Sequence, residues 1–229
     1  RTAPFVSKAI GLQLAKLGAL VMSGVTIKEL SLPKEIKNNS YFSVKEAVFP
    51  FSKFPEVDVL LGPEMKSTGE VMGFGKSFGE AYFKAQRAAG VILPKTGNVF
   101  ISVRDHDKEP ICEVAAELIK MGFDIYATSG TYLHLKESGV TCTKINKVKD
   151  GHPHIVDMIK NNEVNLIINT TEGARSIKDS FSIRKEAQNH KISLTTTVSG
   201  AKAFCKANKF IDDFDAVDLK LRLESLTVN

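Results

Sequence analysis

The sequence predicts an α/β protein whose second part is a five-stranded parallel sheet with helices on both faces, preceded by a small α+β segment. Two observations support this fold class. From residue 98 onward, short β-branched apolar runs alternate with amphipathic runs, which is typical of βαβ units. Before residue 98, aromatic and glycine-rich stretches replace this regular alternation. A chain of 229 residues is long enough for one large or two small domains.

Four segments follow from these patterns. The chain begins with apolar residues at helical spacing and continues with aromatic and glycine-rich stretches. It changes to the regular alternation after a short stretch that contains proline and glycine. We therefore expect a terminal helix at 1–24, a small α+β segment at 25–90, a linker at 91–97 and an α/β domain at 98–229.

The first two segments contain two expected helices. One is expected over residues 5–23, because its apolar side chains fall on one helical face. The run YFSVKEAVFPFSKF alternates and carries aromatic residues, which favours one or two strands. The run LLGPEMKSTGEVMGFG is rich in glycine and indicates an ordered loop with short extended pieces. The second helix is expected over residues 77–89, where Ser77 and Glu80 have the spacing of a capping box.

Five strands and five helices are expected in the α/β domain. The strands are the runs NVFISV, FDIYAT, VTCTKI, VNLIINTT and ISLTTTV. The helices are KEPICEVAAELIKMG, SGTYLHLKESG, HIVDMIKNN, DSFSIRKEAQNH and SGAKAFCKAN. Because strands linked by helical crossovers lie parallel in one sheet, these runs predict a single parallel sheet.

Charge and composition argue against several classes of protein. The net charge is +5, with 13 lysines and arginines against 8 acidic residues in 1–97 and 18 of each in 98–229. Neither part clusters these cations among aromatic residues, so nucleic-acid binding is not expected. No apolar run reaches the ~18–20 residues of a membrane span. The widely spaced Cys112, Cys142 and Cys205 indicate reduced thiols and a cytoplasmic protein.

The residues that follow each expected strand are the candidates for a binding site, because parallel sheets bind ligands outside the carboxyl ends of their strands. They offer hydroxyls, an amide and lysines, and no dense carboxylate group. Helix N-termini add free N–H groups and a positive partial charge. This combination favours a phosphate, although serine and threonine also occur as simple helix caps. The candidates are Lys108, Thr128, Ser129, Gly130, Thr131, Lys147, Asn169, Thr170 and Thr171.

Catalytic and metal-binding groups are less clearly indicated. An enzyme acting on a phosphate needs an acid or base beside the anion, and the strand ends offer several carboxylates and histidines for that role. His152 and His154 in GHPH have no cysteine or carboxylate partner in the pattern, so we expect no metal site. The acid–base candidates are Asp105, His106, Asp107, His152, His154 and Glu172.

Two sets of motifs resemble a known family. The run RTAPFVSKA followed by KFPEVDVLLGPEMKSTGEVMGFGKSF resembles the end of the second ATP-grasp unit of the carbamoyl phosphate synthetase large subunit. The runs YATSGT, INKVKDGHPHI and IINTTEGARSIKDSFSIR resemble its regulatory domain, which has the methylglyoxal synthase-like fold. The resemblance covers nearly the whole chain and implies the C-terminal fifth of that subunit.

This resemblance implies the activity of a larger enzyme. The family makes carbamoyl phosphate from bicarbonate and glutamine-derived ammonia, for pyrimidine and arginine biosynthesis, with ATP and Mg or Mn as cofactors. The partners implied are a glutaminase small subunit and the rest of the large chain. Only Arg1 would reach the edge of the carbamate-phosphorylating site, so the fragment is expected to hold no cofactor and no complete active site.

The resemblance also implies two effector sites. UMP or IMP would place its phosphate on Lys108, Thr128, Thr131 and Lys147, with Asn169 and Thr171 beside it. Ornithine would contact three further residues near the junction with the preceding segment. Two positions depart from the family pattern: Thr195 replaces an Asp, and Ser129 replaces a frequent His. The expected ornithine contacts are Glu46, Leu61 and Thr196.

A stand-alone lyase of the methylglyoxal synthase type, acting on dihydroxyacetone phosphate, is the alternative. It would also explain a phosphate site. That family places its catalytic Asp in a G-G-D segment after a strand, whereas the matching strand here ends in NTTEGA. The regulatory interpretation is therefore favoured over the lyase.

Overall fold

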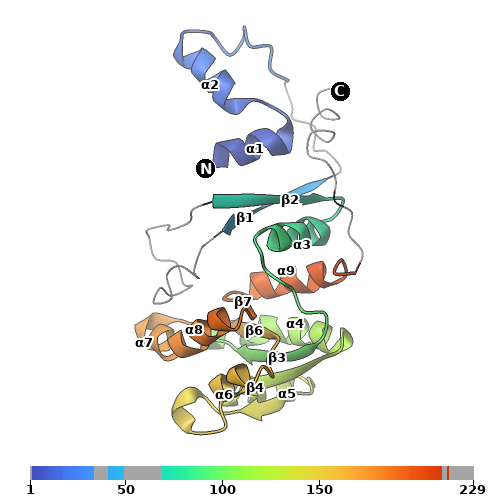
Figure 1. Ribbon diagram of the computed structural model, residues 1–229, viewed down its shortest axis with the longest axis vertical. Helices are drawn as coiled ribbons and strands as arrows, with labels where there is room; N and C mark the ends of the chain where they lie inside the picture. The colour runs from blue at the N-terminus through green and yellow to red at the C-terminus, as the bar shows by residue number, and fades with distance from the viewer. Residues whose placement is uncertain (1, 34–40, 49–68, 213–215, 217–229) are drawn as a thin grey trace.

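The computed structural model describes residues 2–33, 41–48, 69–212 and 216. The described elements follow one another along the long axis, from a helix pair through a small α+β layer to a five-stranded sheet (Figure 1). Arg1 and Leu61 lie outside the described residues, so the predictions made for them stay predictions.

Two short helices replace the single helix expected over residues 5–23. Helix α1 spans Thr2–Ile10 and α2 spans Leu14–Met22, with a bend of 113° between them. The break begins at Gly11, whose φ of +73° lies in the left-handed region that favours glycine. The prediction of one continuous helix was wrong because the apolar periodicity continues through a glycine that redirects the backbone.

Among the described residues, no single helix has the length and apolar character to cross a membrane. Helices α1 and α2 reach that length and apolar character only when the bent pair is counted together.

The small α+β layer contains two strands and one helix. Strand β1, Phe42–Val48, pairs antiparallel with β2, Gly69–Gly75, and both contact α3, Phe78–Ala88. The Ser77 hydroxyl accepts the N–H of Glu80 at 3.2 Å, which confirms the predicted cap. The Glu80 carboxylate accepts the N–H of Lys76 at 2.7 Å.

The five predicted strands are confirmed, and every pairing between them is parallel. The sheet order is β5-β4-β3-β6-β7, so the chain runs outward from the central β3 and then returns to build the other half. This places the topological switch point between β3 and β6. The strands are β3 Gly97–Ser102, β4 Phe123–Thr128, β5 Thr143–Ile145, β6 Leu166–Asn169 and β7 Ser193–Thr195.

Helices cover both faces of the sheet, as predicted. Side chains alternate along the strands: Val99 and Ile101 of β3 enter one apolar core, and Phe100 enters the other. The first core holds residues of α4 Lys108–Lys120, α5 Ser129–Glu137 and α9 Val198–Asn208. The second holds residues of α6 Ile155–Lys160 and α8 Phe181–Asn189.

One helix in this half was missed. A single helix was expected over residues 179–190, but α7 precedes α8 and spans Gly173–Asp179. The sequence of α7, GARSIKD, has no apolar periodicity, so nothing in its pattern distinguishes it from a loop. This helix matters because it borders the cavity described below.

Helix α3 packs directly on α9, which joins the small α+β layer to the sheet (Figure 1). Phe83 of α3 belongs to the same apolar core as β3 and α9. Gly79 lies against the backbone of α9, where an added Cβ would come within 2.3 Å of the Lys206 carbonyl oxygen. The contact therefore requires a residue without a side chain at position 79.

Candidate functional site

A cavity of about 580 Å³ lies at the carboxyl ends of β3, β4 and β6, at the switch point of the sheet. Of the nine residues predicted for a phosphate site, the two that do not line it are Ser129 and Thr171. Strands far apart in the sequence therefore bring the other seven together. They are Lys108, Thr128, Gly130, Thr131, Lys147, Asn169 and Thr170.

The hydroxyl of Thr128 does not cap the helix that follows it. Thr128 occupies the N-cap position of α5, but its side chain makes no capping hydrogen bond. Its Oγ1 lies instead 3.1 Å from the hydroxyl of Ser102, at the end of β3. Since the side chain leaves the first N–H groups of α5 uncapped, this turn has free donors beside the cavity.

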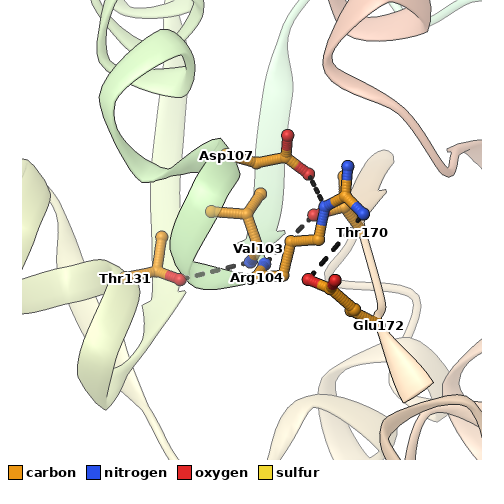
Figure 2. Close-up of polar contacts among 6 residues, drawn as sticks. All are labelled: Val103, Arg104, Asp107, Thr131, Thr170 and Glu172. Atoms are coloured by element: carbon orange, nitrogen blue, oxygen red, sulfur yellow. Dashed lines mark hydrogen bonds and ion pairs between the residues drawn. The ribbon is translucent and has the colours of Figure 1, made fainter. Parts of the chain in front are cut away.

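Two other threonines hold the loop after β3. Thr131 accepts the N–H of Val103 at 3.2 Å, and Thr170 accepts the N–H of Arg104 at 3.1 Å (Figure 2). The Thr131 hydroxyl acts as acceptor in this contact and still has a proton to donate, whereas the Thr170 hydroxyl donates its proton to Asp107. The loop that carries Arg104 is thus fixed from β4–α5 on one side and from the end of β6 on the other.

Arg104 lies between two carboxylates at the edge of the cavity. Its Nε donates to Asp107 Oδ2 at 2.7 Å, and its Nη1 lies 3.9 Å from Glu172 (Figure 2). Burial acts to raise the pKa of Asp107, but hydrogen bonds from Arg104 and Thr170 outweigh it and lower this pKa. Asp107 is therefore an ionised, structural carboxylate rather than a poised general acid.

The lysines of the cavity differ in their partners. Lys108 Nζ lies 2.7 Å from Asp105, and its hydrogen bond and charge, with a smaller contribution from Lys147, lower the pKa of Asp105. Lys149 Nζ forms an ion pair with Asp179 Oδ1 at 2.5 Å. Among the described residues, Lys147 forms no ion pair within 4.0 Å, so its charge remains available to a ligand.

Gly130 and Asn169 complete the polar side of the cavity. A Cβ on Gly130 would lie 3.4 Å from Lys108 Nζ, so glycine leaves space in front of this ammonium group. Asn169 is 2% exposed, and its Nδ2 has no hydrogen-bond partner in the described part of the chain. A buried unpaired donor is costly, so this amide is suited to an acceptor placed in the cavity.

Several lining residues were not predicted from the sequence. Apolar side chains come from the segment after Lys147, from α6 and from α8, and polar ones come from α7 and the start of α8. Val148 and Ile155 directly follow the predicted candidates Lys147 and His154, whereas the sequence carries no signal for the others, because α7 itself was missed. They include Val148, Ile155, Ile183, Ser176, Asp179 and Ser180.

The residues expected to contact ornithine lie elsewhere. Glu46 is on β1, where burial raises the pKa of its carboxyl group and a hydrogen bond with Gln86 partly opposes this. It also helps burial raise the pKa of Tyr82 to about 12. Thr196 follows β7 and does not line the cavity. Helix α3 separates β1 from the sheet in Figure 1.

Comparison with known proteins identifies relatives for most of the chain. The family model described as the MGS-like domain matches residues 110–196. The carbamoyl phosphate synthase large chain of Pseudomonas syringae pv. tomato is 59% identical over 210 residues, which cover 92% of this chain and 20% of that protein. The large chain of Ralstonia nicotianae is 49% identical over 96% of this chain and 20% of that protein.

The chain spans about a fifth of the length of these curated relatives. Among solved structures, a methylglyoxal synthase from Elizabethkingia anophelis NUHP1 is 17% identical and covers 58% of this chain and 93% of that one, with a TM-score of 0.43.

Proposed function

We propose that this chain is the regulatory part of a carbamoyl phosphate synthase, because it is similar to the large chain of that enzyme and matches the MGS-like domain family over residues 110–196. Its cavity would bind the phosphate of UMP or IMP. The whole enzyme would make carbamoyl phosphate in the cytoplasm from bicarbonate and glutamine-derived ammonia, using ATP and Mg or Mn. A glutaminase subunit and the rest of the large chain would be its partners.

The observation that carries this proposal is a set of unused donors around one cavity. The start of α5 has no side-chain cap, Asn169 Nδ2 is buried without a partner, and Lys147 has no ion pair among the described residues. A phosphate dianion would satisfy all three, because its oxygens accept several hydrogen bonds and its charge suits a helix N-terminus.

The rest of the cavity suits a nucleoside. Val148, Ile155 and Ile183 give it an apolar portion that could pack against a flat base. Ser176 and Asp179 offer a hydroxyl and a carboxylate that suit ribose hydroxyls. A volume near 580 Å³ falls within the usual range for small-molecule sites.

The carboxylates of the cavity favour binding over catalysis. Asp105, Glu172 and Asp179 each lie beside a lysine or arginine. The pKa of Asp105 is lowered by Lys108, whereas a general acid working near neutral pH needs a raised pKa. The lyase alternative is less supported, since β6 ends at Asn169 and continues into Thr170, where that chemistry needs an aspartate. A bound effector would act on distant sites through a coupling of ~1–3 kcal/mol.

A second effector, ornithine, is proposed for the layer that contains β1. The half-buried Glu46 carboxylate would face its ammonium group, with Thr196 and Leu61 completing the contacts. The support is the position of Glu46 on β1, against the helix that packs on α9, whose start follows Thr196.

Ligand-dependent melting tests the nucleotide proposal. UMP or IMP at 100 times its Kd should stabilise the chain by ~2.7 kcal/mol, which corresponds to a rise of about 5–11 °C in Tm. Uridine, without the phosphate, should have little effect. T128A and K147A should each abolish most of the shift. K120A is the matched control, because Lys120 lies at the other end of α4, about 18 Å along its axis from Lys108.

Two results would contradict the proposal. One is the absence of any shift with millimolar UMP or IMP, and the other is an equal loss of the shift in K147A and K120A. Release of methylglyoxal from dihydroxyacetone phosphate, measured on the same preparation, would instead support the lyase.

A further inference from the structure

Two histidines and an aspartate converge beside the cavity, at the start of α6. His152 Nδ1 and His154 Nδ1 lie 2.7 Å and 3.1 Å from the same oxygen of Asp157, Oδ2. One potential ligand atom from each of the three residues lies within 4.8 Å of the others. The two imidazole rings are 4.4 Å apart between centroids. From the sequence, the histidines lacked a third ligand, and the fold supplies it.

The polar atoms of this cluster are not fully used by the protein. The His154 side chain is 9% exposed, yet its Nδ1 has no hydrogen bond of suitable geometry in the described part of the chain. A helix cap alone explains only one contact, the 2.9 Å bond from the His154 N–H to Asp157 Oδ2. It does not explain why Nδ1 of the exposed His152 imidazole also lies against Asp157 Oδ2.

The spacing of the three groups suits a small transition-metal ion. Zinc binds imidazole nitrogen at roughly 2.0–2.1 Å and carboxylate oxygen at roughly 2.0–2.2 Å, so tetrahedral ligand atoms lie about 3.3–3.5 Å apart. The distance from His154 Nδ1 to Asp157 Oδ2 must increase by a few tenths of an ångström to reach this spacing. The distance from His152 Nδ1 to the same oxygen must increase further, and the His152 side chain, which is 76% exposed, has room to move.

We infer that His152, His154 and Asp157 form a site for a divalent first-row transition-metal ion of the Zn²⁺ type. Two imidazoles and one carboxylate are ligands that Zn²⁺ favours over Mg²⁺. The exposed side of the cluster leaves a fourth position for water. Asp157 keeps its role at the helix start, because a carboxylate oxygen can accept a backbone N–H while it binds a metal.

The site lies in the segment that forms one wall of the cavity. Asn146 and His154 form a β-bridge, and Lys147 and Ile155, the residues next to them, both line the cavity. A bound metal would fix His152, His154 and Asp157 relative to one another, at the end of this segment next to Ile155. The metal site itself does not depend on the nucleotide proposal, because its three ligands are outside the lining of the cavity.

Calorimetric titration with Zn²⁺ alone, without nucleotide, tests the inference. We expect one ion per chain, and H152A should weaken binding at least tenfold while leaving the metal-free Tm unchanged. D157N should also weaken binding, although an amide oxygen can still cap α6. H190A is the matched control, because His190 contacts Asn162 and Glu186 and takes no part in the cluster.

Co²⁺ and Mg²⁺ test the geometry. Co²⁺ should give the intense visible absorption of a four-coordinate site with the unaltered chain, and H152A should lose it. Mg²⁺ at equal concentration should give no heat. The inference is overturned if the unaltered chain binds no Zn²⁺, if H152A binds it equally well, or if H190A loses binding to the same extent as H152A.

Discussion

Replacing Thr131 by valine would remove one buried hydrogen bond with little change in shape. The Thr131 side chain is buried, and its hydroxyl accepts the N–H of Val103 at 3.2 Å. Valine leaves this N–H without its partner in a site where Val103 is itself 9% exposed. A buried unpaired donor costs about 1–3 kcal/mol, and the length of this bond places the expected loss near 1–2 kcal/mol.

Urea denaturation of T131V measures that loss directly. A decrease of about 1–2 kcal/mol corresponds to a Tm lower by about 2–8 °C for a chain of this size. T131S is the matched control, because it keeps the hydroxyl and removes only a methyl group. Hydrogen exchange distinguishes the two variants: the Val103 amide should exchange faster in T131V and remain protected in T131S. Unchanged stability and unchanged Val103 protection in T131V would refute the reasoning.

Two further predictions concern other parts of the chain. G79A should lower the free energy of unfolding by about 1–3 kcal/mol, because its Cβ would meet the Lys206 carbonyl. G69A should not, since no atom of the described residues lies within 4 Å of a Cβ added at Gly69. Equal Tm values for the two variants would contradict this. Arg104 lowers the pKa of Asp107 in the folded chain, so the ionised Asp107 stabilises the folded state. This stabilisation is fully present above the unfolded pKa of about 3.9 and is lost as pH falls through the lower folded pKa. R104Q should therefore lose less stability than the unaltered chain between pH 5 and pH 2, and parallel acid-unfolding curves would show that the pair contributes nothing.

Local patterns were sufficient to predict the sheet. Strands such as β3 and β6 are short apolar runs, and their parallel arrangement follows from the helices between them. The bend at Gly11 and the polar helix α7 were missed, because apolar periodicity carries no information on backbone direction and is absent from GARSIKD. These errors affect helices at the edges of the fold and leave the sheet unchanged.

The candidate site was predictable where it depends on strand ends. Lys108, Thr128 and Asn169 follow or end parallel strands, so their approach is a consequence of the topology. Residues such as Ser176 and Ile183 reach the cavity only through the packing of α7 and α8, which no local pattern specifies. The proposed third ligand of the histidine cluster was not predicted, because an aspartate three residues after His154 has the spacing of a helix cap and does not by itself indicate a metal ligand.

The contact at Gly79 has a mechanical consequence. Backbone meets backbone there, so no flexible side chain can change its rotamer to absorb a movement of α9. A displacement of α9 along or across its axis must therefore move α3, and with α3 the strand β2 that it covers. The small α+β layer and the sheet are therefore expected to move together as one rigid unit, with Gly79 at the point of contact between them.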